Sequence, residues 1–144
     1  MSVLKDIADA LAVSLAAYSF TSGPQPAVSR VNWPTYDVED MKDPIIAITP
    51  AAAVIERVDR THHQYDYGIN VFLGRHTPTE ALADGMLEMA EELVDILRAH
   101  QWTNDWPTGV TSPYTVEMTM NPDEALQDRN VWRAVVSVTY RVFR

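Results

Sequence analysis

The chain has 144 residues, a formal net charge of −9 and no cysteine. A length of about 150 residues predicts a single domain, spanning 1–144. The lack of thiols excludes a disulfide framework, a cysteine nucleophile and a cysteine-based zinc site. The excess of acidic residues disfavours tight binding to nucleic acid or to an anionic membrane surface. No apolar run approaches the ~18 residues of a membrane-spanning helix, so we expect no membrane association.

The first predicted element is an amphipathic helix over Val3–Tyr18. The apolar side chains of one stripe recur at helical spacing: Ile7, Leu11, Leu15 and Tyr18. Ser2 precedes this stripe and is expected to cap the helix. The prolines at 24 and 26 end the unit, because neither fits a helix interior.

Several short strands are predicted before the next helix. Residues 28–33 form a short extended stretch, and residues 37–41 fit one helical turn. Pro44 and Pro50 bracket the first of the apolar strands. The predicted strands cover Ile45–Thr49, Ala53–Arg60 and Tyr65–Leu73. The polar residues 59–64 suit the tip of a hairpin, whose strands look long enough to extend beyond the sheet.

The most regular helical pattern begins at residues 77–80, Thr-Pro-Thr-Glu, which form a capping box with proline at the first helical position. This helix is predicted to run to about His100. Its apolar side carries Leu82, Met86, Met89, Leu93, Ile96 and Leu97. Its opposite side carries an acidic stripe of Asp84, Glu88, Glu91 and Asp95. Two such faces indicate a helix that packs on a core with one side in water.

A loop over 101–113 follows, and it contains Trp102 and Trp106. Two strands are then predicted, over Tyr114–Met120 and Val131–Phe143. One face of the last strand is apolar: Trp132, Ala134, Val136, Val138, Tyr140 and Val142. Four arginines gather toward the C-terminal end, the first three at odd positions: Arg129, Arg133, Arg141 and Arg144.

The predicted order of elements is α-β-β-β-α-β-β. Short links between the first strands favour antiparallel pairing. The expected fold class is therefore α+β, with an antiparallel β-sheet and the helices packed on one face.

No catalytic motif stands out in the sequence. There is no Gly-x-Ser-x-Gly segment, and the five glycines form no phosphate-binding loop. His62 and His63, with Asp59 and Asp66 nearby, are the obvious place to look for a metal ion. Adjacent residues of a strand point to opposite faces, however, which favours a solvated hairpin tip. We predict no catalytic residue, no metal site, no cofactor and no enzymatic activity.

The charged clusters suggest contacts between copies of the chain. The acidic stripe is either a solvated helix face or a partner surface. If another copy placed the arginine-bearing strand against this stripe, both clusters would be partly neutralised. Trp102 and Trp106 are either anchors of the core or a second contact surface.

The order and spacing of the segments resemble the tail terminator and head–tail joining proteins of tailed bacteriophages, the small proteins of the neck. The resemblance rests on residues 6–11, 30–34, 36–41, 45–50, 65–71, 87–97 and 132–143. It covers most of the chain.

This resemblance implies a non-enzymatic structural protein of the virion, an α+β domain assembled into a ring that is commonly a hexamer. The ring caps the tail tube, ends tube polymerisation and offers a docking surface to the head connector. Its implied partners are other copies of itself, the tail tube protein and the head connector, while DNA passes through without sequence-specific binding. The implied location is the virion neck, and the host cytoplasm during assembly.

Two other functions stay open at this point. One is a small metal-dependent enzyme that uses the region of His62 and His63. The other is a soluble adaptor that binds a protein partner.

Overall fold

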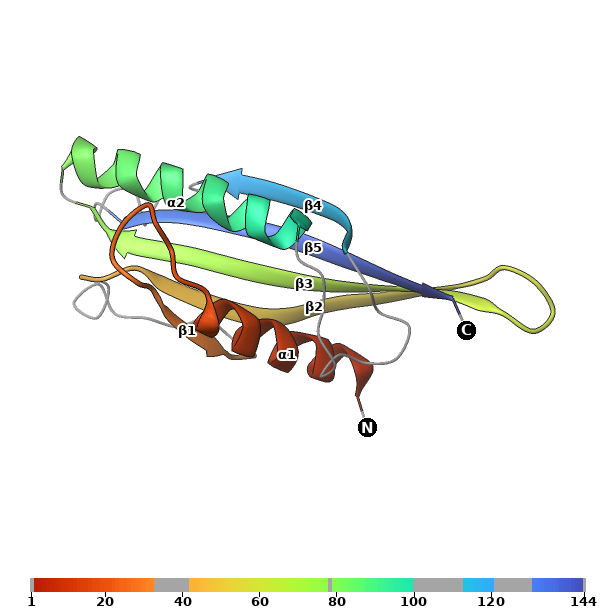
Figure 1. Cartoon of the computed structure of the whole chain (residues 1–144). Coiled ribbons are helices and arrows are strands. Elements are labelled where there is room, and N and C mark those ends of the chain that lie inside the picture. Colours follow the sequence, from red (N-terminus) through yellow and green to blue (C-terminus); the bar gives the residue numbers. More distant parts are fainter. Residues whose placement is uncertain (1, 33–41, 78, 100–112, 121–130, 144) are drawn as a thin grey trace.

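The computed structural model describes residues 2–32, 42–77, 79–99, 113–120 and 131–143. The elements in chain order are α1 (Val3–Ala17), β1 (Ala27–Arg30), β2 (Ile45–Arg57), β3 (His63–His76), α2 (Glu80–Ala99), β4 (Pro113–Met120) and β5 (Val131–Phe143) (Figure 1). The predicted order α-β-β-β-α-β-β is confirmed. The predicted helical turn over 37–41 lies outside the described residues.

The strands form one five-stranded sheet in the order β1-β2-β3-β5-β4. The pairs β2–β3, β3–β5 and β4–β5 are antiparallel. β1 is parallel to β2, with Ala27 opposite Ile45 and Arg30 opposite Ile48. The α+β class is therefore confirmed, but the expectation of a purely antiparallel sheet is wrong at this edge.

β2 is one long strand where the sequence predicted two. The register against β3 shifts between Pro50 and Ala52, so that Ala51 is an extra residue, a β-bulge. Before the bulge Ile48 pairs with Val71, and after it Ala53 pairs with Tyr67. Before the bulge, the even-numbered residues of β2 lie on the same face of the sheet as the odd-numbered residues of β3. After the bulge, the odd-numbered residues of β2 lie on that face. This switch breaks the alternation that marks a continuous strand in the sequence.

Pro50 fits this strand because of where its nitrogen points. The carbonyl of Ile48 accepts a hydrogen bond from the N–H of Val31 at 2.9 Å and therefore faces the β1 side. Residue 50 faces the same side, but β1 has ended there. A proline at this position removes no ladder hydrogen bond between the described strands.

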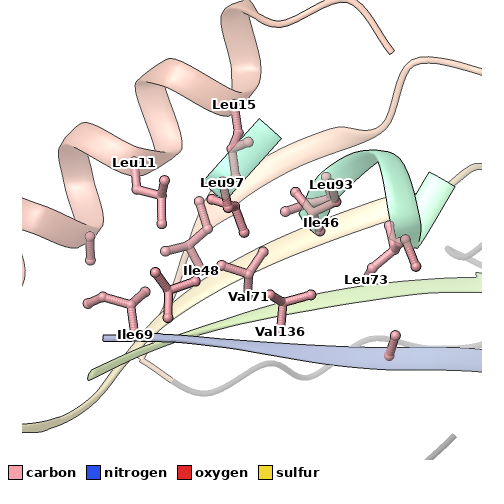
Figure 2. Packing of buried hydrophobic residues seen from close by; sticks show 14 of the residues in the cluster. Leu11, Leu15, Ile46, Ile48, Ile69, Val71, Leu73, Leu93, Leu97 and Val136 are labelled. Atoms are coloured by element: carbon pink, nitrogen blue, oxygen red, sulfur yellow. The ribbon is translucent and has the colours of Figure 1, made fainter. Parts of the chain in front are cut away.

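Both helices pack on one face of the sheet and close a single core (Figure 1). Figure 2 shows side chains of α1 and α2 meeting side chains of β2, β3 and β5. The residues labelled there are Leu11, Leu15, Leu93, Leu97, Ile46, Ile48, Ile69, Val71, Leu73 and Val136. The apolar faces predicted for β3, α2 and β5 are confirmed. We call the covered face the helix side of the sheet and the other face the open side.

Two details at the helix ends differ from the predictions. Tyr18 is the C-cap of α1 in extended conformation, so its side chain leaves the apolar stripe and is exposed. The N-terminal cap of α2 is Thr79, whose hydroxyl accepts a hydrogen bond from the N–H of Leu82 at 3.3 Å. The cap predicted at Thr77 therefore lies two residues too early. Ser2 does cap α1, by accepting from the N–H of Lys5 at 3.2 Å.

The carboxylate of Glu92 on α2 fastens the segment that follows α1. It accepts hydrogen bonds from the N–H groups of Thr21 (3.0 Å) and Ser22 (3.1 Å) and from both hydroxyls (2.9 and 2.7 Å). Partial burial raises the pKa of Glu92, but these hydrogen bonds outweigh it and hold the pKa below 4.5. Glu92 thus links the two helices through the chain that joins α1 to β1.

Candidate functional site

The histidine pair lies at the tip of the β2–β3 hairpin. The carboxylate of Asp59 accepts hydrogen bonds from the N–H groups of Thr61 (2.8 Å) and His62 (2.7 Å). These bonds hold the pKa of Asp59 at about 2, below its ordinary 3.8. The Nδ1 atom of His62 lies 3.1 Å from the same carboxylate, and this ring is exposed. Asp59 therefore organises a tight turn, in the manner of an Asx turn.

His63 belongs to the sheet instead of this turn. It is the first residue of β3, and its ring is 6.4 Å from that of Tyr65, which in turn stacks on Tyr67 at 6.0 Å. Within the described part of the chain, no three His, Asp or Glu side chains gather in a way that could hold a metal ion.

The acidic stripe of α2 lies on the surface of the protein. Asp84, Glu88, Glu91 and Asp95 are all exposed. The buried side of the helix carries Met86, Met89, Ala90, Leu93 and Leu97. The sequence therefore placed the stripe on the correct side of the helix, opposite the core.

The two described arginines of the C-terminal cluster lie on the open side of the sheet. Arg133 has its guanidinium 4.7 Å from the centre of the Phe72 ring. Arg141 forms a two-point ion pair with Asp66, at 2.8 and 3.0 Å, and this pair lowers the pKa of Asp66. Arg129 and Arg144 lie outside the described residues, as do Trp102 and Trp106.

The charge on the open side is nearly balanced. Register places Glu56, Asp66, Glu117, Arg133 and Arg141 on this face. The described strands therefore present three acidic and two basic groups there. The open side therefore has little net charge with which to attract the acidic stripe of another copy.

Among the described residues, the exposed apolar side chains are concentrated at the free end of the β2–β3 hairpin, residues 51–66, which we call the arm. The arm projects beyond both helices (Figure 1). Every residue from 51 to 62 is exposed, and the exposed ones include the apolar side chains of Val54, Ile55 and Val58. β1 pairs with β2 only as far as Ile48, so no described strand covers the outer edge of β2 along the arm.

The two faces of the arm differ in chemistry. Cross-strand pairs put Ala53, Ile55, Arg57, His63 and Tyr65 on the helix side. The same register puts Ala52, Val54, Glu56, Gln64 and Asp66 on the open side. The helix-side face is thus the more apolar and aromatic, and its charged residue is Arg57. The open-side face carries Glu56 and the Asp66–Arg141 ion pair.

Sequence reasoning anticipated a long hairpin with a polar tip but missed its apolar surface. Residues 51–55 read Ala-Ala-Ala-Val-Ile, which is typical of a strand buried on both faces. The signal that could have found the surface is Pro50, since proline in a strand indicates an open edge.

The sequence matches no protein-family model and no curated protein. None of the helices in the described part of the chain has the length and apolar character to cross a bilayer.

Proposed function

We propose that this protein is a non-enzymatic structural subunit of a bacteriophage neck, a tail terminator that assembles into a ring at the end of the tail tube. The ring stops tube polymerisation and gives the head connector a surface on which to dock. Its location would be the virion, and the host cytoplasm before assembly.

The observation that carries this proposal is the arm. Exposed apolar side chains that are concentrated on one projecting element favour contact with another protein. The arm exposes Val54, Ile55 and Val58 on a projecting hairpin with an open strand edge. A subunit that reaches its neighbour in a ring needs such an extension, and a monomeric enzyme does not.

The acidic character of the chain is compatible with this function. A ring that surrounds moving DNA should not bind phosphates, and a net charge of −9 per chain disfavours such binding. The resemblance in segment order to neck proteins is the second line of support.

Native mass spectrometry together with metal analysis of the same purified sample tests the proposal. We expect a metal-free ring, or a metal-free monomer that forms rings on tail tubes in negative-stain images. A monomer with stoichiometric metal would instead favour the small metal-dependent enzyme. A monomer that leaves tube ends bare would contradict the terminator function.

A further inference from the structure

The segment between α1 and β1, residues 18–25, lies against α2, and we call it the strap. Figure 1 shows the chain leaving the end of α1, reaching α2 and returning to β1. After the strap the chain is fixed again, because Pro26 is buried and the N–H of Ala27 donates to the carbonyl of Pro44 at 3.0 Å. Among the described residues, no backbone-to-backbone hydrogen bond joins residues 19–25 to another element. Side chains therefore hold the strap in place.

The side chain of Gln25 closes the strap on itself. Its Oε1 atom accepts a hydrogen bond from the N–H of Phe20 at 3.1 Å. Its Nε2 atom donates to the carbonyl of Tyr18 at 2.6 Å. Loops that are packed by their own side chains in this way are compact units.

The strap is attached to the core by one large side chain and to α2 by two kinds of contact. Phe20 is 7% exposed and belongs to the hydrophobic core. Gly23 lies against Met89, whose Cε atom would be 3.4 Å from a Cβ added at residue 23. The polar contact is the carboxylate of Glu92, which accepts the hydrogen bonds from Thr21 and Ser22 described above.

Glu92 provides the strongest of these attachments. Hydrogen bonds to an ionised carboxylate are stronger than those between neutral groups. The strap carries no charged side chain, and Glu92 forms no ion pair with the described residues. The donors that satisfy this carboxylate thus come from the strap. Loss of these bonds would leave the packing of Phe20 and Gly23 to keep the strap closed.

We propose that the strap opens as a separate unit while the core stays folded, and that Glu92 is the residue that keeps it closed. Opening withdraws Phe20 from the core and uncovers α2 at Met89. The helices keep their contacts with the sheet, because α1 packs on β1, β2 and β3 and α2 packs on β3, β4 and β5. Segments with few buried contacts open at a lower free energy than the whole fold. This inference does not depend on the proposed ring.

Native-state hydrogen exchange followed by NMR tests the role of Glu92 at the amides of Thr21 and Ser22. In Glu92→Gln these amides should exchange about tenfold faster than in wild type, because charge-assisted hydrogen bonds are lost. Glu91→Gln, on the solvated stripe of the same helix, is the matched control and should leave their exchange unchanged. Wild-type exchange in Glu92→Gln would show that this residue does not keep the strap closed.

A substitution in the core distinguishes local opening from unfolding of the whole chain. Ile69 is fully buried and pairs with Pro50 beside the arm. Ile69→Val should speed exchange of the Val136 amide by about threefold or more, because it destabilises the folded core. The open form of the strap keeps the same altered core, so Thr21 and Ser22 should exchange as in wild type. Equal acceleration at all three amides would mean that the strap opens only when the protein unfolds, and would overturn the proposal.

Oxidation of methionine by dilute peroxide gives an independent measure of the open form. Met86 and Met89 are each 1% exposed on α2, but only Met89 is the residue next to Gly23. Glu92→Gln should raise the rate of sulfoxide formation at Met89, measured by peptide mass spectrometry, and leave the rate at Met86 unchanged. Equal rates at the two residues in wild type and in Glu92→Gln would contradict an opening that uncovers α2 at Met89.

Discussion

Glu92 differs from the other acidic residues of α2 because its carboxylate accepts hydrogen bonds from another segment, at Thr21 and Ser22. We expect Glu92→Gln to lower the free energy of unfolding by about 1–2 kcal/mol at neutral pH, since charge-assisted bonds are lost at a partly exposed site. Denaturant titration measures this change. Glu91→Gln is the matched control on the solvated stripe and should change stability little.

The same carboxylate predicts a pH dependence. The pKa of Glu92 in the folded protein lies below 4.5, so the ionised group stabilises the fold above pH 4.5. That contribution is lost as the pH falls through the lowered pKa, because the wild-type carboxylate then takes up a proton. The stability difference between wild type and Glu92→Gln should therefore shrink below pH 4.5. A difference that stays constant down to the acid transition would mean that the ionised form is not what holds the segment.

The Asp66–Arg141 pair on the open side has two-point geometry, with both oxygens of Asp66 engaged. A double-mutant cycle with Asp66→Asn and Arg141→Gln should give a coupling energy of about 1 kcal/mol, because both side chains are partly buried. The coupling should fall with added salt. A value near zero would show that the pair only covers the sheet without stabilising it.

At the scale of whole elements, the arm is expected to be dispensable for folding. The helix-packed core contains no residue between 50 and 66 other than the half-buried Tyr65. Replacing residues 56–64 by Asn-Gly, which favours a tight hairpin turn after the Ile55–Tyr65 pair, should change the free energy of unfolding by less than about 1 kcal/mol. Thermal melting tests this. A large loss of stability would place the arm in the folding unit instead of in a contact surface.

Periodicity explains which elements could be predicted from the sequence. α2 and β5 are long, and each has one apolar face, so their buried residues follow directly from spacing. β1 has four residues, too few to show a period, and its parallel pairing depends on contacts remote in sequence. The sequence predicts two strands in place of the single β2, because the bulge at Ala51 shifts the alternation. The exposed apolar residues of the arm could not be recognised, because spacing reports which face a side chain is on but not whether anything covers it.

For the molecule as a whole, the net charge of −9 sets how assembly responds to salt. Copies brought together through the arm must overcome mutual repulsion, which salt screens. We therefore expect the multimeric fraction to rise as ionic strength increases from low to physiological, as measured by light scattering. Replacing Asp84, Glu88, Glu91 and Asp95 by their amides should strengthen assembly at low salt and flatten this dependence.

The opposite response is expected if the acidic stripe of one copy binds the arginines of another. Salt would then weaken the assembly, the amide substitutions would abolish it, and Arg133→Glu with Arg141→Glu would break it. The attraction between the acidic stripe and these arginines is a weaker driving force for assembly, because Arg141 is already paired with Asp66 and Arg133 lies over Phe72. In an arm-mediated ring, the arginine substitutions should leave the native mass unchanged. The sign of the salt effect thus distinguishes a ring joined by apolar surfaces from one joined by opposite charges.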